Sequence, residues 1–190
     1  MKNTKLFLFF VTAAGLLLSC GKNYTPKELG YFRIDLPEKK YLAVDSVYPY
    51  TFEIPVYAVL RPDPYHPDSY NSNIVFPKFN GTIHLSYFNV TDNIEELIED
   101  NRKMVYKHTI KADAINEQYY KDTLNSVYGV LYEIKGNAAS SVQFYVTDSS
   151  KHFLRGALYF NNVPNKDSIA PVSRFVEEDV DHLIKTLSWK

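Results

Sequence analysis

The sequence has one cysteine, Cys20, in 190 residues, so the chain cannot form an internal disulfide bond. It also has only seven glycines, a single tryptophan and one long apolar run. That run extends from Leu6 to Leu18, which is shorter than the about 20 apolar residues that a membrane-spanning helix needs. The sequence therefore predicts no spanning helix, and the stability of its folded part must come from a hydrophobic core alone.

The first nineteen residues have the features of a bacterial export signal. Lys2 and Lys5 precede the apolar run, and residues 17–20 have the sequence L-L-S-C. An apolar residue, a small residue and a cysteine at these positions match the cleavage site of a lipoprotein signal peptidase. We therefore predict a signal peptide over residues 1–19 and attachment of diacylglycerol and palmitate to Cys20. The alternative, an ordinary signal peptide that ends beside a cysteine, leaves a free thiol in an exported protein.

Length and charge narrow the classes of function. Cleavage after residue 19 leaves 171 residues, which suits one domain and a short tether. Without Lys2 and Lys5 the chain has 19 basic and 22 acidic residues, a formal net charge of −3. This balance and the lack of charge runs predict neither a nucleic-acid-binding surface nor a polybasic membrane patch. The 16 tyrosines and 12 phenylalanines suit half-buried sheet surfaces and also protein interfaces.

Prolines punctuate the first part of the mature chain. Eight of the ten prolines lie within residues 26–77 and divide it into short extended pieces. The pattern predicts a lipidated tether over residues 20–45, then short strands at 50–54 and 56–60. An exposed loop is expected at 63–68.

The chain beyond Pro77 has longer periodic segments. Residues 82–87 alternate as a strand, and Asp92 followed by Glu95 predicts a capping box that begins a helix over 92–109. Turn residues then separate three strands of a predicted antiparallel meander, at 127–135, 141–147 and 152–160.

An amphipathic helix closes the sequence. Pro171 suits the first helical turn, and an apolar stripe extends from Val172 to Leu187. The first meander strand is apolar on both sides, so both faces of the sheet need a cover. The sequence therefore predicts an α+β fold, an antiparallel sheet with a helix on each face, formed by one domain over residues 46–190.

No motif for catalysis or metal binding occurs in the sequence. The five histidines are scattered, without the spacing of zinc ligands: His66, His84, His108, His152 and His182. Ser141 follows loop residues, and a hairpin connection is the preferred interpretation over a nucleophile, which would need an aligned histidine. We therefore expect a protein that is not an enzyme, with no metal, no small-molecule substrate and no cofactor beyond the covalent lipid on Cys20.

The segment after the lipidation site contains the strongest candidate for a binding strip. Residues 30–37 have the sequence G-Y-F-R-I-D-L-P, which places two aromatic side chains and an arginine in an extended segment. Either the segment packs on the domain as an edge strand, or it binds a partner. For the second interpretation the candidate partner-binding residues are Tyr31, Phe32 and Arg33.

Four strings resemble the gliding motility lipoprotein GldD family. They are G-Y-F-R-I-D-L-P-E-K-K-Y at 30–41, K-H-T-I-K-A-D-A-I-N-E at 107–117, Y-G-V-L-Y-E-I-K-G-N-A-A-S-S-V-Q-F-Y at 128–145 and K-H-F-L-R-G-A-L-Y-F-N at 151–161. The resemblance implies a Bacteroidota envelope protein that is required for gliding motility and for the type IX secretion on which gliding depends. It also implies other envelope proteins of that machinery as partners. By a looser analogy, the order of elements resembles the Mog1/PsbP-type α/β/α sandwich.

Two functions remain as hypotheses. The first is a non-catalytic accessory or assembly factor that acts through protein contacts, and the alternative is a lipid-anchored periplasmic protein that binds a small ligand between sheet and helix. Residues 21–23 lack the acidic cluster that resembles a cell-surface export signal of Bacteroidota lipoproteins. We therefore expect the periplasmic face of a membrane, and favour the outer membrane over the inner one.

Overall fold

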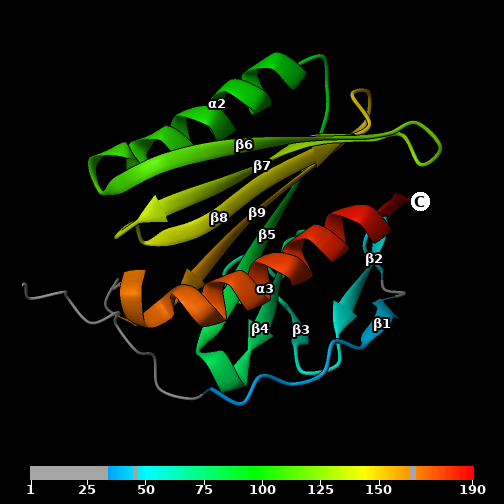
Figure 1. The fold of residues 1–190 in the computed structure, drawn as a ribbon. Helices are drawn as coiled ribbons and strands as arrows, with labels where there is room; N and C mark the ends of the chain where they lie inside the picture. The colour runs from blue at the N-terminus through cyan, green and yellow to red at the C-terminus, as the bar shows by residue number, and fades with distance from the viewer. Residues whose placement is uncertain (1–33, 45–46, 163–165) are drawn as a thin grey trace, which may run out of the picture. The chain divides into compact units, whose positions relative to one another are not determined.

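The computed structural model describes residues 34–44, 47–162 and 166–190, which form two antiparallel sheets and two α-helices (Figure 1). The strands are β1 (Tyr41–Val44), β2 (Tyr50–Pro55), β3 (Val59–Pro62), β4 (Ser72–Phe76), β5 (Gly81–Asn89), β6 (Ala112–Asp122), β7 (Val127–Gly136), β8 (Ser140–Thr147), β9 (His152–Phe160) and β10 (Ser188–Trp189). The helices are α2 (Ile94–Tyr106) and α3 (Lys166–Thr186), and the 3-10 turns are η1 (Pro77–Phe79) and η2 (Lys107–Ile110).

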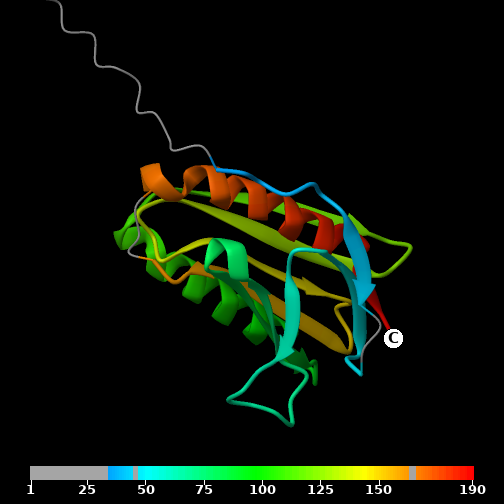
Figure 2. The same ribbon diagram turned by 90° about the horizontal axis from the view of Figure 1, so that it is seen from below.

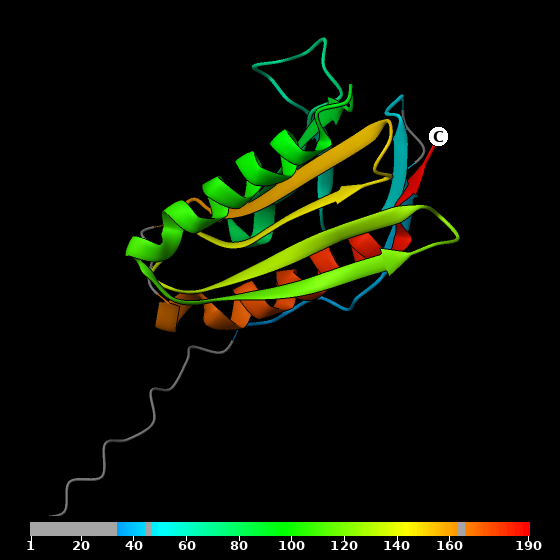
Figure 3. The ribbon, with the colours of Figure 1, turned by 90° about the horizontal axis from the view of Figure 1, so that it is seen from above.

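Seven strands form the main sheet in the order β3-β4-β5-β9-β8-β7-β6, with every neighbouring pair antiparallel. A smaller sheet has the order β1-β2-β10. The helix α2 lies on one face of the main sheet, while α3 lies on the other face together with the smaller sheet (Figures 1 and 3). The predicted α+β architecture, with a helix on each face of an antiparallel sheet, is confirmed.

Each face of the main sheet has its own apolar layer. In β7, Val130 and Ile134 pack in the layer that contains Val105 of α2, whereas Val127 and Leu131 pack in the layer beneath α3. Successive side chains of a strand point to opposite faces, so a strand that is apolar at every position needs two covers. The two-faced pattern predicted for this strand is the observed one.

The closing helix buries the predicted stripe. The buried apolar residues of this stripe are Val176, Val180, Leu183 and Ile184 in α3 and Leu187 directly after it. The helix begins at Lys166, before the predicted start, so Pro171 lies inside it rather than in its first turn. Proline has no backbone N–H, so Pro171 removes one hydrogen bond of the helix. The loss falls near the start of the helix, where the first N–H groups have no helical partner in any helix.

The central helix differs from its prediction at both ends. It begins at Ile94 with Asn93 as N-cap, and no side chain caps it, so the predicted capping box is wrong. The reason is local: Asp92 has a left-handed φ of 60°, and the Asn93 side chain accepts a bond from the Thr91 N–H instead. Beyond Tyr106 the chain tightens into η2.

The folded part begins earlier than the predicted boundary at residue 46. Within the segment predicted as tether, β1 pairs antiparallel with β2, with Leu42 opposite Ile54. The compact unit that contains all described residues spans Arg33–Lys190. The strand predicted at 56–60 also starts late, at Val59, because the chain turns after Pro55.

Candidate functional site

The residues predicted as lipid-attachment site and as partner-binding strip lie outside the described part of the chain. These are Cys20 as lipid site and Tyr31, Phe32 and Arg33 as partner-binding strip. The described chain begins at Ile34, so the structure shows how the chain that follows the strip is held.

That chain is fastened to α3 by a buried carboxylate. Lys39 Nζ lies 2.6 Å from Asp179 Oδ1, contacts the Phe175 carbonyl and sits 3.7 Å above the Phe175 ring. The hydroxyl of Tyr41 donates to Asp179 Oδ1 at 2.9 Å, and that of Tyr57 donates to Asp179 Oδ2 at 2.7 Å. The Asp179 side chain is 1% exposed. We call these residues the Asp179 cluster.

The electrostatics of the Asp179 cluster favour a structural role. Burial raises the pKa of the Tyr41 and Tyr57 hydroxyls, and the hydrogen bonds to the Asp179 carboxylate raise it further. Both phenols therefore stay protonated and keep donating at neutral pH. One cation and two hydroxyls share the carboxylate oxygens, so both oxygens have partners and the group is shielded from water.

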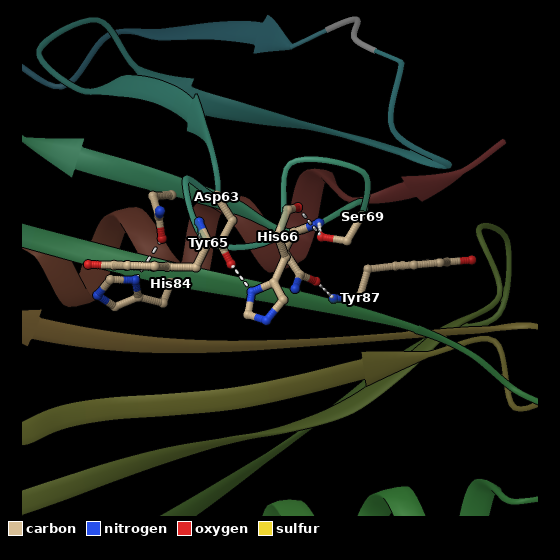
Figure 4. A network of polar contacts seen from close by, with 8 residues as sticks. Asp63, Tyr65, His66, Ser69, His84 and Tyr87 are labelled. Atoms are coloured by element: carbon tan, nitrogen blue, oxygen red, sulfur yellow. Dashed lines mark hydrogen bonds and ion pairs between the residues drawn. The ribbon is translucent and has the colours of Figure 1, made fainter.

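The five histidines come from different elements of the fold, although His66 and His84 both interact electrostatically with Asp63 (Figure 4). Four of them have side-chain hydrogen-bond partners: His66–Asp63, His84–Asn73, His152–Tyr87 and His182–Glu53. Burial lowers the pKa of His84 and also that of His108. Within residues 34–44, 47–162 and 166–190, no three metal-ligating side chains come together as a group that could hold an ion.

Ser141 meets another serine rather than a histidine. Its Oγ lies 2.8 Å from Ser173 Oγ on α3, and Ser173 Oγ also lies 2.8 Å from the Glu177 carboxylate. Burial raises the pKa of Glu177, an effect partly offset by the bond from Ser173. The described contacts thus join the start of β8 to α3, and they do not form the Ser-His pair that a hydrolase would need.

The loop between β3 and β4 is exposed but ordered by its own polar groups. Figure 2 shows it extending away from the sheet, and Figure 4 shows its contacts. Asp63 accepts the Tyr65 N–H at 3.0 Å and pairs with His66 Nδ1 at 2.9 Å. Ser69 Oγ donates to the His66 carbonyl at 2.7 Å and accepts the Asn71 N–H at 3.2 Å. We call residues 63–71 the β3–β4 loop.

The sheet beneath holds the same loop in place. The Asn71 side chain accepts the Tyr87 N–H of β5 at 2.9 Å, and the Tyr70 ring packs edge-on against the Tyr87 ring at 5.6 Å. The Tyr65 N–H, and then the His66 side chain, hold the pKa of Asp63 below its usual value. The loop therefore presents Tyr65, which is 87% exposed, on a fixed backbone.

A single polar side chain is orphaned in the layer beneath α2. Asn101 is 1% exposed, and neither its amide nitrogen nor its amide oxygen has a hydrogen-bond partner among the described residues. The apolar residues around it pack Val105 of the same helix against β7 and β9. A buried amide without partners costs about 1–3 kcal/mol of stability.

The fold is similar to a solved structure described as the solution structure of cyanobacterial PsbP (CyanoP) from Synechocystis sp. PCC 6803. The TM-score is 0.50 at 8% sequence identity, and the match covers 90% of this chain and 100% of that chain. At this identity the likeness concerns the fold alone. The chain is thus an α+β sandwich of the PsbP type, and none of its described helices is long and apolar enough to cross a membrane.

A family model described as gliding motility lipoprotein GldD matches residues 21–189. The chain belongs to this family, and it is accordingly a lipid-anchored protein of the cell envelope that is linked to gliding motility. No curated protein matches the sequence.

Proposed function

We propose that the chain is a non-catalytic accessory or assembly factor of gliding motility and of the associated type IX secretion. It acts by binding other envelope proteins of that machinery. Diacylglycerol and palmitate on Cys20 hold it at the periplasmic face of a membrane, the outer one rather than the inner one. Membership of a gliding motility lipoprotein family supports the setting, and the surface of the domain supports the mode of action.

The observation that carries the proposal is the ordered, exposed β3–β4 loop. Tyrosine is enriched at the centres of protein interfaces, where a few aromatic side chains supply most of the binding energy. A loop already fixed by Asp63, Ser69 and Asn71 loses little further freedom when a partner covers it. The exposure of Tyr65 on a fixed backbone is therefore more typical of a residue that contacts a partner than of a surface tyrosine without a function.

The strip of Tyr31, Phe32 and Arg33 is a second contact candidate. It directly precedes the segment that the Asp179 cluster fastens to α3. When one chain carries two contacts for the same partner, binding through the first raises the effective concentration of the second. The strip and the β3–β4 loop are thus two candidate surfaces of one contact protein.

Co-purification tests both surfaces. Tagged protein would be isolated from detergent-solubilised envelopes of a deletion strain carrying the wild-type chain, Tyr65→Ala, or the triple alanine variant of the strip. We expect at least one of these variants to lose an envelope partner about tenfold, the effect of removing about 1.4 kcal/mol of binding energy. Leu124→Ala is the matched control, since Leu124 is 95% exposed on a different loop. Equal recovery of every partner by all four chains would contradict the proposal.

Asn101 favours the alternative, a lipid-anchored protein that binds a small ligand. Its orphaned amide offers a donor and an acceptor inside an apolar layer, which is the usual composition of a ligand site. Native mass spectrometry of the protein released gently from envelopes tests this reading. A bound small molecule that Asn101→Leu abolishes would support the ligand-binding function over the contact function.

A further inference from the structure

One end of the main sheet combines exposed lysines with an exposed isoleucine. Lys107, Ile110 and Lys111 come from η2 and the residue after it, and Lys135 comes from the end of β7. Ile110 is 87% exposed, and the three lysines are exposed as well. We call these four residues the η2 end.

Backbone contacts hold the two parts of the η2 end together. The Asn137 N–H donates to the Lys111 carbonyl at 3.1 Å, and Ala112 stands opposite Gly136 in the β6–β7 ladder. Gly136 has a φ of +112°, and a Cβ there would lie 2.7 Å from the Asp113 nitrogen. The close approach that glycine permits brings the backbone directly after Lys135 against the Lys111 carbonyl. In the sequence, 24 positions separate Lys135 from Lys111.

Acidic groups offset the charge of the η2 end only in part, because Lys135 interacts electrostatically with Glu177 of α3. None of them forms an ion pair with a residue of the described chain, whereas the nearby Lys103 lies 3.4 Å from Asp100. Asp113 is the only acidic residue between positions 101 and 116. A cationic surface around an exposed aliphatic side chain is the composition of sites that rest on anionic lipid.

The first described residues lie beside η1, where Lys78 Nζ donates to the Asp35 carbonyl. The η2 turn and the start of α3 lie at the same end of the fold in two views (Figures 1 and 3). The described chain passes Phe175 at Lys39 and reaches His182 at Tyr41, so it runs from the first half of α3 toward its C-terminus. Residue 34 is 14 positions after Cys20, a separation that spans at most about 50 Å.

We propose that the η2 end docks on the surface of the membrane that holds the anchor. Ile110 enters the headgroup region, and Lys107, Lys111 and Lys135 lie over anionic phospholipid headgroups. This proposal rests on the lipid anchor of the proposed function and adds an orientation to it. Each lysine strengthens binding to an anionic surface about fivefold. This gain in affinity is too small to hold a free protein at a membrane. It suffices to orient a tethered protein, because the lipid anchor keeps the domain close to the membrane surface.

The opposite end of β6 provides a matched control. The β6–β7 hairpin carries Leu124, which is 95% exposed, and Lys121 precedes it on the same strand. An exposed aliphatic side chain near a lysine is thus present at both ends of one strand. Only the η2 end has three lysines and lies at the end of the fold where α3 begins (Figures 1 and 3).

The single cysteine makes the test direct. Because lipid occupies Cys20, Ile110→Cys or Leu124→Cys introduces the only free thiol, which is labelled with an environment-sensitive fluorophore. The full lipidated protein is reconstituted into phosphatidylethanolamine vesicles with or without phosphatidylglycerol, and a quencher is placed on the acyl chains. We expect the label at 110 to be quenched at least about threefold more than the label at 124. The difference should require phosphatidylglycerol and fall in high salt.

Charge reversal completes the experiment. Adding Lys107→Glu and Lys111→Glu to Ile110→Cys should abolish the quenching, whereas adding Lys121→Glu should not. If the label at 110 remains in water while the protein floats with the vesicles, this proposal is overturned and the anchor is not. Equal quenching of the labels at 110 and 124 has the same consequence. In that case, loss of motility in the Lys107→Glu, Lys111→Glu chain would assign the surface to a protein partner. A chain that fails to float overturns the anchor and this proposal together.

Discussion

Asp179 is the residue on which the position of the N-terminal segment depends. Its buried carboxylate pairs with Lys39, 140 positions away, and two tyrosine hydroxyls complete its contacts. A buried pair adds little stability compared with an apolar pair of the same size, but removing one partner leaves the other charge uncompensated. The Asp179 cluster therefore fixes the position at which residues 39–41 contact α3.

Asp179→Asn should destabilise the domain by about 3 kcal/mol, because the Lys39 ammonium would lose its buried counter-charge. Thermal unfolding should shift down by about 10 °C, and hydrogen exchange should quicken at the backbone amides of residues 38–44. Glu178→Gln is the control, since Glu178 is 71% exposed and lies 3.7 Å from the same ammonium. Similar exchange at 38–44 in both variants would show that the cluster does not hold the segment.

Asp148 sets the turn between β8 and β9. Burial alone would raise its pKa, but hydrogen bonds from the amides of His152, Lys151 and Ser150 outweigh burial and lower the pKa to about 2. A carboxyl whose pKa is lower in the folded chain stabilises the fold above its unfolded pKa of about 4. That stabilisation disappears as the pH falls through the folded value.

Asp148→Ala should cost about 1 kcal/mol at neutral pH, less than the full pKa shift implies because the group is only partly buried and solvent screens its charge. Urea unfolding of both chains between neutral pH and about pH 2 measures the difference. The gap in unfolding free energy should be constant above about pH 4 and shrink toward zero near pH 2. A gap that stays constant throughout would contradict the role of the charge.

At the scale of elements, α3 is the cover on which one layer of the core depends. Val180→Asp should unfold the domain or destabilise it severely, because the carboxylate would be buried without a partner, at a cost of several kcal/mol against a total stability of about 5–15. Circular dichroism melting of the soluble chain measures the effect. An unchanged melting temperature would mean that this stripe does not face the core, and Lys185→Asp on the exposed side provides the comparison.

Strands could be predicted where their own pattern carried the information. The strands β7, β8 and β9 are rich in apolar residues because both of their faces are covered. These apolar runs, bounded by turn residues, predict the ends of the three strands to within a residue or two. The edge strand β6 was missed because most of its side chains are exposed, so Asn116, Glu117 and Gln118 give no alternation. The short β1 and β10 were missed because pairing with β2 forms them, and pairing is not visible in a local pattern.

The contact sites were less predictable than the strands, for a related reason. The sequence indicated an exposed loop at 63–68, but its order depends on Tyr87 of β5, and the two segments meet only in the fold. Asp179 lies among charged helix positions that usually face solvent, and it is buried only because Lys39 and Tyr57 reach it. Asp63-Pro64-Tyr65 is an Asx-turn pattern that could have suggested order in the loop.

At the scale of the whole molecule, we propose a lipid-anchored protein that acts by contact. Family membership places it in the envelope and links it to gliding motility. In the described residues, the β3–β4 loop is ordered and exposed, and the Asp179 cluster holds residues 39–41 against α3. The described side chains do not bring any histidine to Ser141.

The central claim, that the protein works by contact and not by catalysis, is tested most directly by complementation of a deletion strain. Colony spreading and secreted protein would be scored at matched abundance for the triple variant Tyr31→Ala, Phe32→Ala, Arg33→Ala. Single alanine variants form the comparison set: His84, His108, His152 and Ser141. We predict that the triple variant is present and lipidated but does not restore spreading, while each folded single variant does. Loss of spreading from Ser141→Ala or a single histidine variant at normal abundance, with full motility from the triple variant, would contradict the account.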